Sequence, residues 1–206
     1  MKRICVFIGF IALLSACTKK YVTPDNHTVV IGGTTYPTVI IGDQVWTTAN
    51  LKGFNGYHSN AHSQYGDYYS ALFITLPTGW RAPTIADYNK LMSNFTSTDK
   101  DQYGYFHLNA AEVAPLLSTT GWPAPLQGTN QSGFNAQPAG FFSDPGQGAI
   151  YHGGSAYFAT SDVNPENGTF GFSITADGAY VKGAKVSDTS YYFSVRFVMD
   201  RNSPPL

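Results

Sequence analysis

The sequence predicts an α+β domain made mainly of antiparallel sheets, with one or two helices and long glycine-rich loops. Three observations predict it: short runs of β-branched and aromatic residues, frequent turn residues between them, and one stretch of strong helical periodicity. Among the 206 residues, 21 are Gly and 12 are Pro, and aromatic residues make up 15%. This composition is typical of a turn-rich sheet protein.

Two strand–turn–strand patterns open the domain. Strands are expected at 29–31, 36–41 and 44–47, with Gly32-Gly33 and Gly42-Asp43 between them. Glycine in the first place of a two-residue loop accepts the positive φ of a type II′ turn, so both loops predict hairpins.

One helix has a clear start. Thr84 is followed three residues later by Asp87, as in a capping box, and apolar residues then recur at helical spacing. A second helix is expected around Asn109 to Leu117, because Asn109 and Glu112 form a similar pair. A proline inside that range limits how far this helix extends.

Further strands are expected in the second half of the chain. They cover 134–142, 149–160, 169–175, 179–181 and 192–199. In the last of these, the odd-numbered residues from Phe193 to Met199 share one face, and Ser194 and Arg196 share the other.

The amino terminus predicts export. A basic start at Lys2 and Arg3 precedes an apolar run that is shorter than the roughly 20 residues of a membrane-spanning helix. The following Leu-Ser-Ala-Cys string, ending at Cys17, resembles the bacterial lipobox, which implies cleavage before Cys17 and lipidation of its sulfur. The expected organisation is a signal peptide at 1–16, a lipidated cysteine and tether at 17–27, and a domain at 28–203. The lipid on Cys17 is then expected to anchor the protein in the membrane, as in an outer membrane lipoprotein of the bacterial envelope. Whether the domain faces the periplasm or the cell surface stays open.

Composition excludes several kinds of chemistry. The chain has two cysteines, Cys5 in the predicted signal peptide and Cys17 at the lipid, so no thiol is expected in the folded domain. Charged residues make up only 12% and form no basic cluster, so no nucleic-acid partner is expected.

Six stretches resemble, in order, motifs of the Fibrobacter succinogenes major paralogous domain family. They are YPTVIIGDQVWTTANL at 36–51, YGDYY at 65–69, LPTGWRAPT at 76–84, LSTTGW at 117–122, SGFNAQPAG at 132–140 and YFSVRFVMD at 192–200. The resemblance implies a fold related to C-type lectin-like domains and formylglycine-generating enzymes, in which the first and last strands pair. Two departures matter: Leu76 and Phe197 stand where many relatives carry cysteines, and 158–161 lacks the usual tryptophan.

No enzymatic activity and no cofactor are expected. Glu112 and Glu166 are the only glutamates, and Glu112 is better explained as a helix cap than as half of a glycosidase pair. The histidines are expected to be solvated loop residues rather than zinc ligands; those considered are His58, His62, His107 and His152.

Calcium stays open as an alternative at 162–167. Oxygen-bearing side chains crowd this loop, but its spacing departs from an EF-hand, and an Asx/Pro turn explains it equally. No metal is therefore assigned to this loop.

The expected function is a non-enzymatic, envelope-anchored binding or interaction module for a glycan or a protein. The three tryptophans fall in framework motifs and are assigned to the core, whereas tyrosines in the loops 54–63 and 151–166 offer contact area with few torsions to freeze. The candidate binding residues are Tyr57, His58, Tyr151, Tyr157, Asp162, Asn164 and Glu166. The alternative is a structural or adhesion accessory component of a surface assembly, without a small-ligand site.

Overall fold

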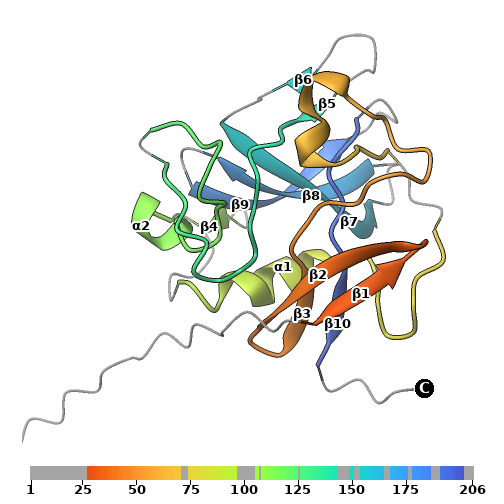
Figure 1. The fold of residues 1–206 in the computed structure, drawn as a ribbon. Helices are drawn as coiled ribbons and strands as arrows, with labels where there is room; N and C mark the ends of the chain where they lie inside the picture. Colours follow the sequence, from red (N-terminus) through yellow and green to blue (C-terminus); the bar gives the residue numbers. More distant parts are fainter. Residues whose placement is uncertain are drawn as a thin grey trace, which may run out of the picture.

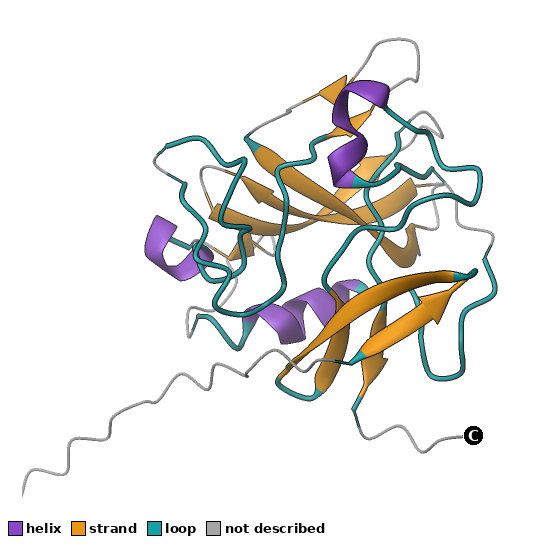
Figure 2. Ribbon diagram, in the orientation of Figure 1, coloured by secondary structure: helices purple, strands orange, loops and turns teal. Residues whose placement is uncertain are grey.

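Two four-stranded antiparallel sheets dominate the structure, a computed structural model, and a helix packs against both (Figures 1 and 2). The described residues are 27–70, 74–96, 105–106, 108–124, 126–142, 149–150, 154–164, 168–175, 178–186 and 191–201. The mixed, mostly sheet architecture predicted from the sequence is confirmed. The predicted signal peptide, Cys17 and most of the tether lie outside the described residues.

The first sheet contains both predicted hairpins. Its strands are β1 (Thr28–Ile31), β2 (Thr34–Ile41), β3 (Gln44–Thr47) and β10 (Val198–Asp200). The type II′ assignment is wrong for the first turn, because Gly32 and Gly33 both have positive φ, at 54° and 83°, which is the type I′ pattern.

The expected pairing of the first and last strands is also wrong. The sheet order is β1-β2-β3-β10, so β1 and β10 occupy opposite edges. The two tight turns force β1, β2 and β3 into a meander, which leaves β1 with β2 as its neighbour in the sheet. The free edge of β3 then receives β10, with Val198 opposite Trp46.

The second sheet is formed by later segments. Its order is β4 (Tyr105–Phe106), β9 (Gly178–Val186), β8 (Gly168–Thr175) and β7 (Ser155–Asn164). Two short strands, β5 (Phe141–Phe142) and β6 (Ala149–Ile150), pair separately.

The strand predicted at 134–142 is wrong for all but its last two residues. Gly133, Asn135 and Gly140 have φ of 73°, 56° and 62°, and left-handed residues interrupt an extended backbone. The segment predicted at 192–199 is likewise broken: bridges at 192–194 and the strand β10 flank residues 195–197.

The helices begin where their caps predict. Helix α1 (Ile85–Met92) has a full capping box between Thr84 and Asp87, and α2 (Ala110–Val113) has one between Asn109 and Glu112. The second helix is shorter than expected, because Pro115 has no N–H to continue the ladder. A further element, the 3₁₀ segment η1 (Asn60–Tyr65), was not predicted.

The main core lies where α1 meets the two sheets. The Tyr88 ring of α1 lies 5.2 Å from the Trp46 ring of β3 and stacks on the Phe172 ring of β8 at 4.4 Å. Trp122 also belongs to this core, and Trp80 packs partly buried on a second cluster, as the assignment of the tryptophans to the framework predicts.

The second cluster takes in Leu76 and Phe197, the two positions at which the sequence departs from the motifs that it resembles. Phe197 is 1% exposed in this cluster, and Leu76 packs against it. Apolar packing therefore occupies both positions.

The described chain ends lie at one end of the molecule. In Figure 1, the chain enters β1 and leaves β10 in the lower half, whereas η1, β5 and β6 lie at the top. Surfaces around η1 therefore point away from both ends. Among the described residues, no helix is long and apolar enough to cross a bilayer.

Candidate functional site

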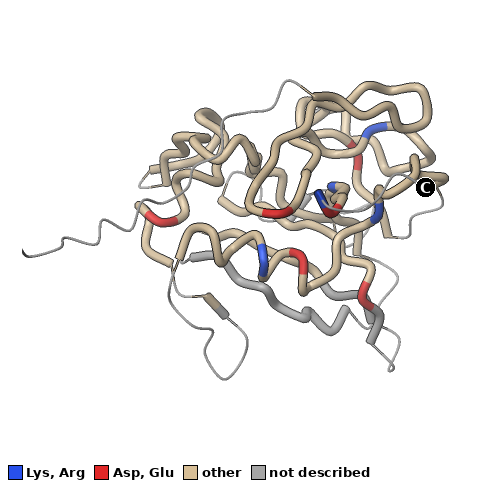
Figure 3. Tube along the Cα trace, turned by 90° about the horizontal axis from the view of Figure 1, so that it is seen from below, with Lys and Arg blue, Asp and Glu red and all other residues tan. Residues whose placement is uncertain are grey.

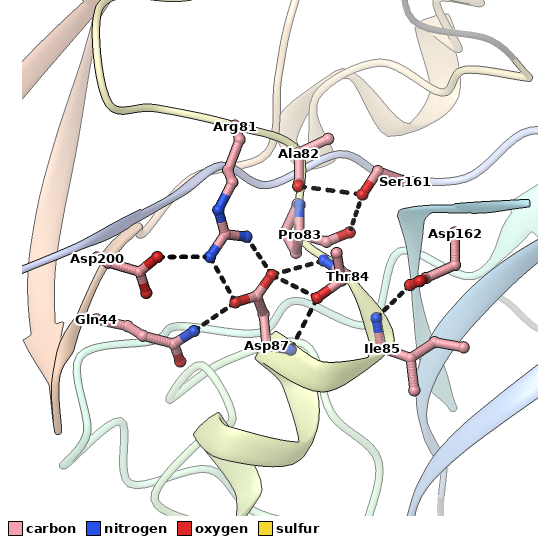
Figure 4. A network of polar contacts seen from close by, with 10 residues as sticks. All are labelled: Gln44, Arg81, Ala82, Pro83, Thr84, Ile85, Asp87, Ser161, Asp162 and Asp200. Carbon is pink, nitrogen blue, oxygen red and sulfur yellow. Dashed lines mark hydrogen bonds and ion pairs between the residues drawn. The ribbon is translucent and has the colours of Figure 1, made fainter. Parts of the chain in front are cut away.

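Three polar centres stand out among the described residues, and the first is an ion-pair network at the start of α1 (Figure 4). The Arg81 guanidinium binds both carboxylate oxygens of Asp87, and its Nη2 also donates to Asp200 Oδ2 at 3.0 Å. Gln44 Nε2 donates to Asp87 Oδ1 at 2.7 Å. These bonds join the helix start to β3 and β10, which are neighbours in the first sheet.

Asp87 is fully engaged in this network. Burial raises the pKa of Asp87, but hydrogen bonds from Arg81 and from the backbone and hydroxyl of Thr84 outweigh it and hold the pKa below its ordinary value. The hydrogen bond to Asp87 raises the pKa of Arg81 in turn. A carboxylate that stays ionised and saturated with donors stabilises the framework and is poorly suited to proton transfer.

Asp162, a predicted binding residue, also belongs to the helix start. Its Oδ2 accepts a hydrogen bond from Ile85 N at 2.5 Å, and the hydroxyl of the neighbouring Ser161 donates to Pro83 O at 3.3 Å (Figure 4). Ser161 N also donates to Pro83 O, at 2.7 Å. A carboxylate is favourable there because the first N–H groups of a helix have no intrahelical partner. Tyr151, Glu166 and the side chain of Asn164 lie outside the described residues, as do His107 and His152.

The second centre is a buried arginine. Arg196 is 0% exposed and donates to Asn50 Oδ1 at 2.6 Å and to the carbonyl oxygens of Thr47 and Phe134 at 2.7 and 2.9 Å. Its guanidinium lies 5.2 Å from the centroid of the Phe134 ring and 5.5 Å from that of Phe158. Burial lowers the pKa of Arg196 to about 9, so the group is charged at neutral pH.

The third centre, in the loop 53–69, pairs an exposed histidine with a buried aspartate. His58 Nδ1 and Asp67 Oδ1 lie 2.6 Å apart, and Gly53 N donates to Asp67 Oδ2 at 2.6 Å. The His58 side chain is 42% exposed and that of Asp67 only 5%. The sequence interpretation of His58 as a solvated loop residue is therefore incomplete, because Asp67 fixes one side of its ring.

A tight turn precedes this pair. Phe54 and Asn55 have φ of 59° and 61°, and Gly56 N donates to Gly53 O at 3.1 Å. Left-handed φ at a bulky residue costs about 1–3 kcal/mol and persists only where neighbours impose it. The Phe54 ring lies over Gly32, where a Cβ would come within 1.8 Å of the ring.

A hydrogen-bonded backbone ladder connects the loop to the rest of the fold. Tyr57 and Tyr68 exchange two backbone hydrogen bonds, Tyr69 and Phe193 exchange two, and so do Tyr192 and Phe142. Because directly opposed residues of a ladder share a face and successive residues alternate, this ladder has two distinct aromatic faces.

We call the first of these the tyrosine face: Tyr57, Tyr65 and Tyr192 packed on buried Tyr68 and Phe142. All three outer rings are partly exposed. Tyr57 meets Phe142 edge-on at 4.7 Å and lies 6.2 Å from Tyr192. Burial raises the pKa of Tyr68, whose hydroxyl donates to Ala139 O at 2.7 Å.

Tyr157 lies on the other face of the ladder. It meets Phe141 edge-on at 4.8 Å and packs in a cluster with Phe193. Of the predicted binding residues, Tyr57 and Tyr157 therefore do not share a surface, although the sequence grouped them. His58 and Asp67 are the next pair along the ladder after the Tyr57–Tyr68 bridge. Because successive residues alternate, the His58–Asp67 pair lies on the same face as Tyr157 and not on the tyrosine face.

Sequence reasoning missed Tyr65, Tyr192 and Asp67. The alternation within Tyr191-Tyr192-Phe193 and within Phe141-Phe142 contained a signal that two aromatic faces exist. No local pattern showed that the loop 53–69 lies beside these residues.

The geometry fits recognition by rings and hydroxyls. Charged residues are sparse along the described trace (Figure 3). Within the described residues, no three His, Cys, Asp or Glu side chains gather closely enough to hold a metal ion.

Comparison with known proteins places the chain in a family. No curated protein and no solved structure matches it. The family model for the Fibrobacter succinogenes major domain matches residues 39–199. This range includes the second sheet, Arg81 with Asp87, and the tyrosine face, whereas β1, the start of β2 and Asp200 lie outside it. The chain therefore belongs to the Fibrobacter succinogenes major domain family.

Proposed function

We propose that this chain is a non-enzymatic lipoprotein of the outer membrane, anchored through Cys17, whose domain is a binding module for a glycan or a protein. We further propose that its fold is of the C-type lectin-like kind, as the resemblance in its motifs implies. Family membership fits a surface protein.

The observation that carries the proposal is the tyrosine face. Its rings come from segments far apart in the sequence, and paired backbone hydrogen bonds hold those segments together. A surface that is already ordered loses little conformational entropy when a ligand binds. Tyrosine adds a large contact area with a polar tip, which is why it is enriched at recognition surfaces.

The position of this face supports a tethered module. The face includes residues of η1 and β5, which lie at the end of the molecule remote from the start of β1 (Figure 1). A lipid on Cys17 would then leave the tyrosine face directed away from the membrane.

The anchor and the binding surface are tested separately in cells. Cys17→Ser is expected to move the full-length protein from the membrane fraction to the soluble fraction. A photo-crosslinking amino acid at position 57 is expected to capture a ligand in intact cells, whereas the same amino acid at position 157 is not. Membrane retention of Cys17→Ser contradicts the anchor, and equal capture or no capture at the two positions contradicts the binding role.

A further inference from the structure

We propose that the tyrosine face binds a neutral oligosaccharide and does so without calcium. This inference rests on the proposed binding function and names the class of its ligand. It follows from the shape, the charge and the rigidity of the face.

The rings of the face form a contiguous partly apolar floor. Tyr57 and Tyr192 lie 6.2 Å apart with their planes tilted by 58°. Tyr57 meets Phe142 edge-on, and Tyr192 packs on the same buried cluster of Tyr68, Ala139 and Phe142. Tyr65 packs on the same cluster, and the His62 ring stacks on it at 6.2 Å. A pyranose ring has an apolar C–H face and a hydroxyl rim, which match aromatic rings that end in hydroxyl groups.

The charge of the face argues for a neutral ligand. The segments that build it, 57–69, 139–142 and 191–193, contain one carboxylate and no Lys or Arg. That carboxylate is Asp67, which is 3% exposed and already contacts His58 and Gly53. An ionic ligand would lose its hydration without gaining an opposite fixed charge.

The same inventory argues against calcium. Calcium takes six to eight oxygen ligands and usually several carboxylates. The single carboxylate of the face, Asp67, is buried in its pair with His58. Asp162 lies outside the face and accepts a hydrogen bond from Ile85 N at the start of α1. Stacking and hydroxyl contacts are therefore the means of recognition that the face offers.

Hydrogen bonds from buried residues beneath the tyrosine face hold its backbone in place. Asn50 Nδ2 donates to Tyr65 O at 2.7 Å, and Asn50 Oδ1 accepts from buried Arg196. On the edge of the ladder, the His58–Asp67 pair fixes the residue after Tyr57. His58 is thus a positioning residue for the loop rather than a ligand contact.

The test applies the full chain, in detergent, to an array of neutral oligosaccharides, once in the presence of calcium and once in the presence of EDTA. The affinity for each glycan that binds is then measured by calorimetry. Tyr57→Ala is compared with Tyr157→Ala, because the two rings make equivalent edge-on contacts, at 4.7 Å to Phe142 and at 4.8 Å to Phe141, on opposite faces. The expected result is binding that EDTA leaves unchanged and that falls at least tenfold in Tyr57→Ala but less than threefold in Tyr157→Ala.

Each other outcome overturns the inference. Binding lost in EDTA assigns recognition to a calcium site, and equal losses in both variants remove the tyrosine face from it. If no glycan on the array is bound, a neutral oligosaccharide is rejected as the ligand. In that case, capture of a protein through position 57 in cells would still support the proposed binding function. No capture in cells would reject both the inference and the proposed function. Thermal unfolding of both variants, expected to shift equally, shows that a difference in binding is not a difference in folding.

Discussion

Arg196 donates its Nε proton to Asn50 Oδ1 at 2.6 Å in the centre of the molecule, and its other described acceptors are backbone carbonyl oxygens. No described carboxylate contacts it. This guanidinium therefore organises the backbone of three separate segments, 47–50, 134–135 and 194–196, around a single cation.

Replacing Arg196 is expected to be among the most destabilising single changes. Arg196→Met removes the Arg196 hydrogen bonds from the buried carbonyl oxygens of Thr47 and Phe134, and a buried group that loses its partner costs about 1–3 kcal/mol. We expect a loss of about 3 kcal/mol or more in the free energy of unfolding, measured with urea. Arg196→Lys keeps the positive charge but loses the planar guanidinium that donates in several directions, and it is expected to recover only part of the lost free energy of unfolding. The control is exposed Arg201→Met; equal stability of Arg196→Met and this control would contradict the role of Arg196.

The turn between β1 and β2 allows a paired glycine test. Alanine at Gly32 or Gly33 suffers a left-handed φ in both cases, but only at Gly32 does the new Cβ meet another residue, 1.8 Å from the Phe54 ring. Gly32→Ala is therefore expected to lose about 1–3 kcal/mol more than Gly33→Ala in urea unfolding. The excess is expected to disappear in a Phe54→Ala background. If the excess persists there, the contact between Phe54 and Gly32 is not its cause.

The Arg81 network predicts acid sensitivity. Because the pKa of Asp87 in the folded protein is below its ordinary value of 3.8, the unfolded chain takes up the proton first as pH falls. The stability from this group is full above pH 3.8 and is lost progressively below it. Asp87→Asn is expected to lower stability at neutral pH and to flatten the decline at acid pH, in urea unfolding at a series of pH values. Asp43→Asn, at a side chain 72% exposed, is the control and is expected to do neither.

Two buried tyrosines respond differently to loss of the hydroxyl. The Tyr68 hydroxyl donates to Ala139 O, whereas the Tyr88 hydroxyl has no hydrogen-bond partner among the described residues. Tyr68→Phe is expected to lose about 0.5–1.5 kcal/mol, and Tyr88→Phe is expected to be neutral or stabilising. Denaturation at neutral pH measures both, and the reverse order would contradict the assignment of these two hydroxyls.

The same tyrosines set the alkaline limit of the fold. Burial raises the pKa of both Tyr68 and Tyr88 above the ordinary value of 10.0. The unfolded chain therefore releases these protons first, so stability is full below pH 10.0 and falls as pH rises above it. Tyrosinate absorption, followed together with unfolding, is expected to show part of the tyrosines ionising only as the protein unfolds. Complete ionisation of all tyrosines in the folded state would contradict this.

Local signals predicted the parts of the fold that depend on a few neighbouring residues. The glycine turns located β1, β2 and β3, and the pairs Thr84–Asp87 and Asn109–Glu112 located both helix starts. These features succeed because a turn or a cap needs only backbone conformation and one side chain nearby.

Long-range features were beyond the sequence. Alternation placed Arg196 opposite Phe197, but it did not show that both faces of this segment are buried. The pairing of β10 with β3 and the contact between His58 and Asp67 depend on how distant segments meet. For the same reason, Tyr57 and Tyr157 were assigned to one surface although a ladder separates them.

The location of the two chain ends has a practical and evolutionary consequence. Since the chain enters at β1 and leaves at β10 on the end opposite η1, additional modules or labels joined to either end would not obstruct the tyrosine face (Figure 1). Under the proposed binding function, several copies joined in series would each keep the tyrosine face accessible, and weak individual contacts with a repetitive ligand would then sum to avidity.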